Sequence, residues 1–171
     1  MSLARSPLAW ILGLTLLSRL AELALAEINT RRLRAQGWRE VGAGHYPLVV
    51  ALHASLLAAL ALTTPPSRAP IWPLVGLLVI LNILRFWTIA SLGPYWTTRV
   101  LTQDAAPLVK RGPYRFLRHP AYLVATLEVI VLPTIFGDWA IALIWGVGNI
   151  LVLRRRIGVE DEALAGRRTL G

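Results

Sequence analysis

Residues 71–92 read IWPLVGLLVILNILRFWTIASL, and this stretch decides the fold class. A membrane-spanning helix needs about 20 consecutive, mostly apolar residues, because each residue advances the helix by only ~1.5 Å. The stretch has the required length, and Arg85 is its only ionisable residue. It therefore predicts a transmembrane helix.

Four further apolar segments favour the same interpretation, and they cover residues 8–26, 47–62, 121–135 and 139–153. The chain has 171 residues, of which 56% are hydrophobic and 16% charged, and its mean hydropathy is +0.57. These values are typical of a membrane protein. The sequence thus predicts an all-α polytopic membrane bundle of about five transmembrane helices in a single domain, with four spans as the alternative.

The cations are distributed unevenly between the two sides of this predicted bundle. Fourteen of them fall in segments 27–46, 92–120 and 154–168, whereas the opposite side carries Arg5 and Arg68. Short cytoplasmic loops are rich in Lys and Arg, so we expect an inner-membrane protein with its N-terminus outside and its C-terminus cytoplasmic. Because the cations flank apolar runs, the net charge of +9 indicates contact with membrane lipids and no nucleic-acid partner.

Charged residues within the predicted spans need partners, because a charge at membrane depth is costly. Arg19 and Glu22 are three residues apart, so they are expected to pair on one helix face, although lining a substrate cavity is the alternative. His53 is expected to be a hydrogen-bonded packing residue, with a functional role as the alternative.

Two more pairs of polar residues are expected to connect helices. Asn82 and Arg85 share a helix face, and Arg85 is near enough to a helix end to extend toward the membrane surface. Glu128 and Asn149 are expected to face each other across the hairpin formed by the last two spans. Contact with a polar part of a substrate is the alternative for both pairs.

The first segment with chemical character is KRGPYRFLRHPAY, residues 110–122. Pro120 suits the first turn of a helix, where free N–H groups and the positive end of the dipole favour an anion. Arg118, His119 and Tyr122 are therefore candidates for binding an anion or handling a proton. A basic loop that binds anionic lipid is the alternative.

The second such segment is RRRIGVEDEAL, residues 154–164, which follows the last predicted span. As a helix it places Arg156 and Glu160 on one face, and Glu160 with Asp161 can receive a cationic ligand group. A surface helix with exposed ion pairs is the alternative. The chain has no cysteine, which excludes thiolate metal sites and a cysteine nucleophile, and we expect no metal.

The pattern Gly-Pro-Tyr-Arg-x-x-Arg-His-Pro-x-Tyr at residues 112–122, followed by Arg-Ile-x-x-Glu-Asp-Glu-x-Leu at 156–164, resembles the isoprenylcysteine carboxyl methyltransferase family of integral membrane enzymes. The resemblance covers residues 92–164. The sequences RLAEL at 19–23 and LGPYWTT at 92–98 are also similar to a bacterial branch that methylates alkylpyrones or alkylresorcinols.

This resemblance implies S-adenosylmethionine as the methyl donor, bound in a cytoplasmic pocket between the two segments. The residues that it implies as lining the cofactor are Lys110, Gly112, Pro113, Tyr114, His119, Pro120 and Tyr122. Glu160 and Asp161 would meet its amino-acid or ribose portion, although the family usually has Glu-Glu where this chain has Glu-Asp. Arg118 would hold the acceptor's oxygen, which makes Arg118 and Glu160 the candidate catalytic residues. The candidate substrate-binding residues are Arg85, Trp96 and Arg156.

The expected reaction is methyl transfer to an oxygen of a lipophilic acceptor, namely the hydroxyl of a long-chain polyketide. The branch also implies a type III polyketide synthase as a pathway partner. Such a transfer mainly requires that donor and acceptor be aligned and water excluded. Methylation of a prenylcysteine carboxylate or of a phospholipid amine is the enzymatic alternative. A membrane scaffold or lipid-binding protein is the alternative without catalysis.

Overall fold

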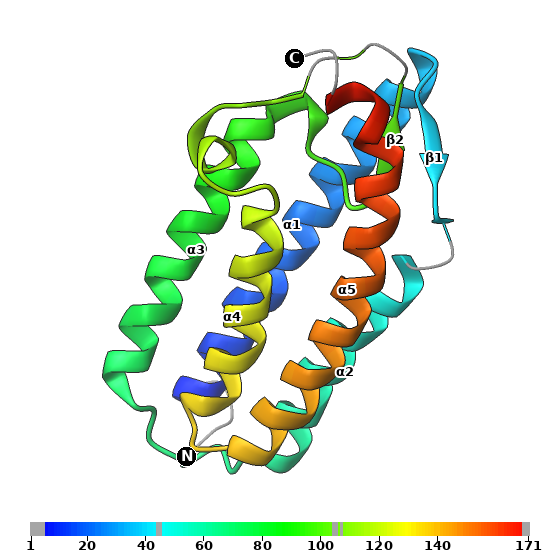
Figure 1. The fold of residues 1–171 in the computed structure, drawn as a ribbon. Coiled ribbons are helices and arrows are strands. Elements are labelled where there is room, and N and C mark those ends of the chain that lie inside the picture. Colours follow the sequence, from blue (N-terminus) through cyan, green and yellow to red (C-terminus); the bar gives the residue numbers. More distant parts are fainter. Residues whose placement is uncertain (1–5, 44–45, 104–105, 107, 169–171) are drawn as a thin grey trace.

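The fold is a bundle of five helices in the part of the chain that the computed structural model describes, residues 6–43, 46–103, 106 and 108–168 (Figure 1). Successive helices run in alternating directions. The connections α1–α2 and α3–α4 and the end of α5 consequently lie together, and we call this end of the bundle the polar end. The helices are α1 (Pro7–Ala35), α2 (Tyr46–Thr63), α3 (Trp72–Leu92), α4 (Pro120–Thr134) and α5 (Trp139–Arg168).

The helices begin and end where the local sequence favours it. Ser6 caps α1, since its hydroxyl accepts a hydrogen bond from the backbone N–H of Ala9 at 3.1 Å. Pro120 is the first residue of α4, where its missing N–H costs nothing. Gly93, with a φ of +54°, ends α3. The predicted span at 71–92 is thus confirmed as a helix to within one residue.

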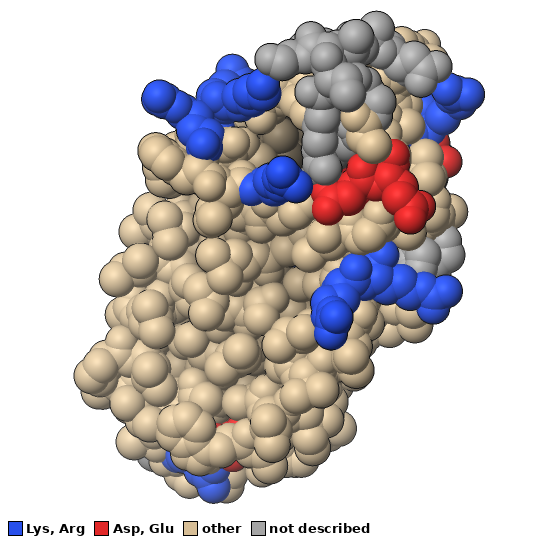
Figure 2. Space-filling model, viewed as in Figure 1, with Lys and Arg blue, Asp and Glu red and all other residues tan. Residues whose placement is uncertain are grey.

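The helices have the composition of a membrane protein. Three helical stretches of the described chain are long and apolar enough to cross a membrane, Pro7–Ala35, Tyr46–Thr63 and Trp72–Tyr95. Large apolar side chains such as Leu14, Ile83 and Leu143 point outward and are more than 60% exposed. Figure 2 shows a broad uncharged belt on the visible face, with charged residues gathered toward the two ends. The prediction of a polytopic helical membrane protein is confirmed at this level.

The last two helices differ from these three. α4 is apolar but only 15 residues long. α5 has 30 residues, of which the first half is apolar and the second half strongly charged. Both helices exist where the sequence predicts them, and a count of five spans stays a prediction.

The segment between the first two predicted spans contains more structure than the sequence indicated. α1 continues to Ala35, and a short strand β1 (Arg39–Val41) follows it. β1 pairs antiparallel with β2 (Val100–Thr102), with Glu40 opposite Leu101. The all-α expectation is therefore incomplete, because a two-stranded ladder covers part of the polar end. Arg5, counted above for orientation, lies outside the described residues.

α4 is the central helix of the bundle, since it packs against both α3 and α5. The main hydrophobic core surrounds the far half of α4 and includes Leu56, Leu60, Leu81, Leu132 and Ile135, all nearly fully buried. This core holds the helices together away from the polar end. The polar end is left to loops, strands and charged side chains.

Candidate active site

A cavity of about 450 Å³ lies at the polar end of the bundle. Its wall is formed by residues from α2, α3, the connection after α3, the segment before α4, the first turns of α4 and the second half of α5. The volume falls within the range of ~300–1,000 Å³ that is usual for small-molecule sites. The cavity therefore has room for a ligand of cofactor size.

Most of the side chains that the sequence singled out meet at this cavity. Those in its wall are Lys110, Tyr114, Arg118, His119, Tyr122 and Glu160, together with the three substrate candidates Arg85, Trp96 and Arg156. The two segments 110–122 and 154–164 thus come together in one site, although the first lies before and at the start of α4 and the second lies on α5. The remaining candidates, Gly112, Pro113, Pro120 and Asp161, lie behind the wall.

A hydrogen-bonded chain joins α4 to α5 at the cavity. The hydroxyl of Tyr122 donates to the Glu160 carboxylate and accepts from Arg156 Nε at 2.8 Å. Arg156 Nη2 in turn donates to the Thr98 carbonyl at 2.6 Å. The His119 ring stacks on Tyr122 with 5.4 Å between the ring centroids. We call Arg118, His119, Tyr122, Arg156 and Glu160 the cavity cluster.

Asp161 faces His119 and lies outside the cavity wall. The distance between its Oδ1 and His119 Nε2 is 3.1 Å, while His119 Nδ1 is 3.9 Å from Glu160 Oε2. Asp161 thereby holds the imidazole ring of His119 next to Glu160. This geometry gives Asp161 an indirect part in shaping the site.

Gly112 allows the loop before α4 to dock on the end of α3. Its φ is +56°, and a Cβ atom at this position would lie 2.0 Å from Ser91 Oγ and 3.2 Å from Trp87 Nε1. Only glycine tolerates both the backbone conformation and this contact. Pro113, which is buried, and Pro120 hold the path of the chain on either side of Tyr114. These three residues support the site from behind.

Arg118 and Tyr114 contribute different groups to the wall. Within the described part of the chain the Arg118 guanidinium makes no hydrogen bond or ion pair, and the residue is exposed. Burial, together with the nearby charge of Glu160, raises the pKa of the Tyr114 phenol above its ordinary value. Arg118 therefore offers a cation to a ligand, and Tyr114 offers a neutral hydroxyl.

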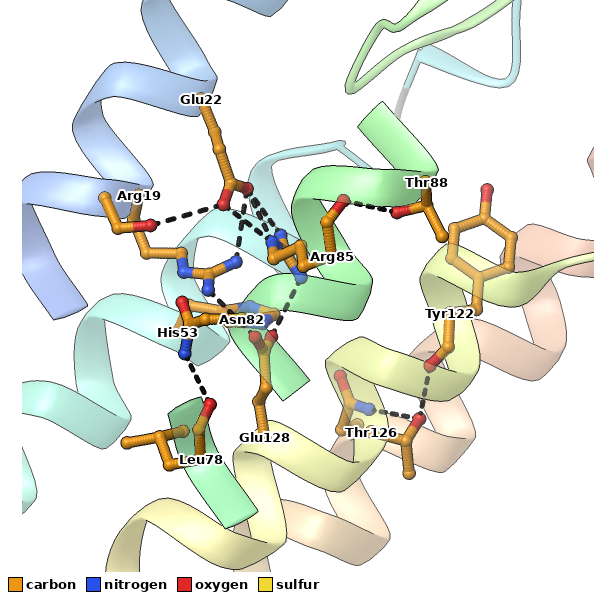
Figure 3. Close-up of polar contacts among 12 residues, drawn as sticks. Arg19, Glu22, His53, Leu78, Asn82, Arg85, Thr88, Tyr122, Thr126 and Glu128 are labelled. Atoms are coloured by element: carbon orange, nitrogen blue, oxygen red, sulfur yellow. Dashed lines mark hydrogen bonds and ion pairs between the residues drawn. The ribbon is translucent and has the colours of Figure 1, made fainter. Parts of the chain in front are cut away.

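Four charged residues pair with one another beneath the cavity (Figure 3). Arg85 Nη2 is 2.7 Å from Glu22 and its Nη1 is 2.9 Å from Glu128. Arg19 is 3.1 Å from Glu22 and 3.2 Å from Glu128. We call Arg19, Glu22, Arg85 and Glu128 the buried tetrad. The predicted pairing of Arg19 with Glu22 is confirmed.

The buried tetrad corrects two other predictions. Arg85 does not extend to the membrane surface, and Glu128 pairs with two arginines rather than facing Asn149. The reason is electrostatic, because two cations and two carboxylates neutralise one another where an unpaired charge would be costly. Asn149 instead donates to Thr126 Oγ1 at 3.0 Å. Asn82 donates to the Leu78 carbonyl in its own helix at 2.9 Å.

Other cavity residues were not among the site candidates of the sequence analysis. His53 has the expected packing contact, a hydrogen bond between Nδ1 and the Val49 carbonyl at 2.8 Å, but it also lines the cavity. Thr97, Thr98 and residues 108–109 line it as well. Thr97 and Thr98 belong to the LGPYWTT sequence noted above, and for residues 108–109 the proximity to the motif at 110–122 was the available signal.

Comparisons with known proteins show which family the chain resembles. The family model described as the isoprenylcysteine carboxyl methyltransferase (ICMT) family matches residues 74–166, which include most of the cavity wall. The chain is also similar to an uncharacterized protein, YpbQ, of Bacillus subtilis (strain 168). The two are 32% identical over 160 residues, which is 91% of this chain and 95% of the relative. No solved structure matches the chain significantly.

Proposed function

The chain belongs to the isoprenylcysteine carboxyl methyltransferase family, and we propose that it methylates an oxygen of a long-chain polyketide. Family membership makes it a methyltransferase that uses S-adenosylmethionine. Its apolar helices indicate that it acts as an integral membrane protein. The identity of the acceptor and the roles of individual residues are the parts that we propose.

The observation that carries the proposal is the meeting of both sequence motifs at one cavity. S-adenosylmethionine presents an amino group, a carboxylate, ribose hydroxyls and a sulfonium. The wall offers a carboxylate at Glu160, cations at Lys110 and Arg118, and the neutral hydroxyl of Tyr114. The residues present therefore fit the cofactor in volume and in charge.

Each residue has a defined task in this proposal. Glu160 receives the amino group or the ribose hydroxyls, and Tyr122 orients its carboxylate. Asp161 acts through His119, whose ring it fixes beside Glu160. Residues 110–114 form the part of the wall that covers the rest of the cofactor, with Gly112 and Pro113 setting their path.

Arg118 holds the acceptor oxygen while it attacks. When bound, S-adenosylmethionine supplies an electrophilic methyl group on a sulfonium. The enol of an alkylpyrone is acidic and largely ionised at neutral pH, so for this acceptor a cation that holds the oxyanion suffices. The hydroxyl of an alkylresorcinol is a phenol and would pass its proton to water or to a neighbouring side chain as it attacks. The nitrogen of a phospholipid amine carries no negative charge as it reacts, so Arg118 cannot hold the reacting atom there, and this difference favours an oxygen acceptor.

The apolar part of the wall suits a lipophilic acceptor. Val49, Leu92, Ala125 and Leu153 line the cavity and belong to helices whose outer faces are apolar. We propose that the alkyl tail extends between these helices toward the lipid. The acceptor would be an alkylpyrone or alkylresorcinol, made by a type III polyketide synthase in the same pathway.

The cation distribution supports a cytoplasmic polar end. With five spans, the polar end and the C-terminus would face the cytoplasm and the start of α1 the outside. This orientation gives the cavity access to the donor, which is a cytosolic metabolite.

The acceptor can be tested with purified protein in nanodiscs and methyl-labelled S-adenosylmethionine. We expect labelled product from a hydroxy-alkylpyrone or an alkylresorcinol, and none from a prenylcysteine analogue or phosphatidylethanolamine. Transfer only to the prenylcysteine analogue, or only to the phospholipid, would overturn the proposed acceptor. Calorimetric titration with S-adenosylhomocysteine should show one site, and an absence of binding would overturn the cavity assignment.

A further inference from the structure

Trp96 lies in the cavity wall. It follows the short helix η3 (Gly93–Tyr95), and its backbone N–H donates to the Gly93 carbonyl at 3.0 Å. Its own carbonyl accepts a hydrogen bond from Asn29 Nδ2 at 2.8 Å. The residue is only 7% exposed and packs against apolar side chains of α1, α3 and α4. The two hydrogen bonds hold the backbone of Trp96, and the indole ring lies among these apolar side chains.

The indole N–H of Trp96 has no hydrogen-bond partner among the residues that the structure describes, although the nitrogen is buried. A buried tryptophan N–H normally has a partner, because water no longer supplies one. Trp96 also lines the 450 Å³ cavity. Both observations point to a group of a molecule that enters this cavity as the partner, reached by a small turn of the ring, since the nitrogen is buried in the wall as it stands.

The chemistry of the indole limits what that group is. An indole N–H only donates, so its partner must be an acceptor atom. Carboxylates and oxyanions bind most strongly to cations, which Arg118 and Lys110 provide in the same wall. The group that remains for a neutral donor is an uncharged oxygen, such as a ring carbonyl or a second hydroxyl.

We propose that Trp96 Nε1–H donates to a second oxygen of the methyl acceptor while Arg118 holds the oxygen that is methylated. The site would then select ring acceptors that carry two oxygens, since an acceptor with one oxygen leaves the N–H unpaired. This inference rests on the proposed function, and it defines the substrate class more narrowly. Both alkylpyrones and alkylresorcinols meet the requirement, whereas a simple alkylphenol does not.

The test compares two acceptors of equal chain length in wild-type protein and in Trp96→Phe. The first is the alkylpyrone or alkylresorcinol that the wild type methylates. The second is its analogue without the carbonyl or hydroxyl oxygen that is not methylated, such as an alkylphenol in place of an alkylresorcinol. Phenylalanine keeps an aromatic ring in the wall and removes only the donor. We expect the KM of the first acceptor to rise about tenfold, as for one lost hydrogen bond, and that of the analogue to stay unchanged.

Trp145→Phe is the matched control. Its indole N–H already donates to Ser55 Oγ at 3.0 Å, and it does not line the cavity. We expect this variant to keep the wild-type KM for both acceptors. The affinity for S-adenosylhomocysteine should be the same in wild type and both variants.

A second measurement does not depend on turnover. In protein labelled with ¹⁵N at the tryptophan side chains, the Trp96 resonance is identified by its absence from Trp96→Phe. Its N–H signal should move downfield when the acceptor is added and stay in place with S-adenosylhomocysteine alone.

The outcomes separate the two proposals. If the wild type is active and Trp96→Phe has the wild-type KM for the first acceptor, the role of Trp96 is overturned and the proposed function stays intact. A loss of S-adenosylhomocysteine affinity in Trp96→Phe would assign the N–H to the cofactor and equally overturn the inference. A wild type that methylates neither an alkylpyrone nor an alkylresorcinol contradicts the proposed function, and this inference is rejected with it.

Discussion

The buried tetrad and the cavity cluster both contain arginines and acids, but they arrange them in opposite ways. In the tetrad each carboxylate contacts two arginines, and the four side chains are at most 14% exposed. In the cavity cluster Arg118 is exposed and the Glu160 side chain is 25% exposed. Arg85 belongs to the tetrad and also lines the cavity. The charges of the tetrad hold helices together, whereas Arg156 and Glu160 are hydrogen-bonded to neighbouring residues and we propose that Arg118 and Glu160 also contact a ligand.

The largest effect should come from removing the cation that the cavity cluster offers to the acceptor. Arg118→Met should lower kcat about 100- to 1,000-fold, because the developing interaction with the oxyanion is lost. Titration with S-adenosylhomocysteine should give an unchanged affinity. Arg115→Met is the control, since Arg115 is an exposed cation of the same loop outside the cavity wall. Equal activity of the two variants would remove Arg118 from the acceptor site.

Opening the tetrad should cost stability. Arg85→Leu leaves two carboxylates with one arginine, and we expect a loss of about 3 kcal/mol in the free energy of unfolding. Denaturation in detergent, followed by tryptophan fluorescence, measures it. The double variant Arg85→Leu/Glu22→Leu restores neutrality and should recover most of the loss. If the double variant is less stable than the single one, the tetrad is not held by charge balance.

A substitution of Glu160, the acid of the cavity cluster, should weaken cofactor binding without destabilising the fold. Glu160→Gln should weaken S-adenosylhomocysteine binding about 30-fold, as expected for the loss of a charge-assisted hydrogen bond. The unfolding midpoint should change little. Glu162→Gln, an exposed acid two residues further along α5, should bind as wild type. An unaltered affinity in Glu160→Gln would contradict the assigned contact.

The smallest effect concerns Tyr114, a cavity residue whose side chain is partly buried from solvent. Because burial raises the pKa of its phenol above the ordinary 10.0, the folded protein keeps the proton at a pH where the unfolded chain loses it. The contribution of this group to stability is therefore complete below pH ~10 and declines as the pH rises above that value. Between pH 9 and pH 11, the unfolding temperature of Tyr114→Phe should fall less than that of the wild type.

Absorbance at 295 nm provides the control for this prediction. At pH ~10.5 the unfolded wild type should show more phenolate than unfolded Tyr114→Phe, whereas the two folded proteins should show the same amount. Additional phenolate in the folded wild type would mean that Tyr114 is accessible to solvent.

The sequence predicted the helices well, because a long apolar run has a single stable solution in a bilayer. It missed β1 and β2, since strands of three residues have no periodic pattern to recognise. It identified the pair Arg19 and Glu22 from their spacing on one helix. Their partners Arg85 and Glu128 come from distant helices, and only the packing of α1 with α3 and α4 brings them together.

The candidate site was predictable to a similar degree. The two local motifs led to residues such as His119 and Glu160, because their patterns are compact in sequence. His53 and Thr98 reach the same cavity from other elements, and only the fold shows that they line it. That the Trp96 N–H lacks a partner among the described residues became visible only when its surroundings were known.

The β1–β2 ladder has a consequence for how the protein matures. It joins the connection after α1 to the connection after α3, and Thr102 also donates to the Ala163 carbonyl of α5 at 3.3 Å. These segments leave the ribosome at different times, and contacts between residues that are distant in sequence form late in folding. The first helices can enter the membrane while the site is still incomplete. A chain interrupted before α5 would consequently be inserted in the membrane without a finished cavity.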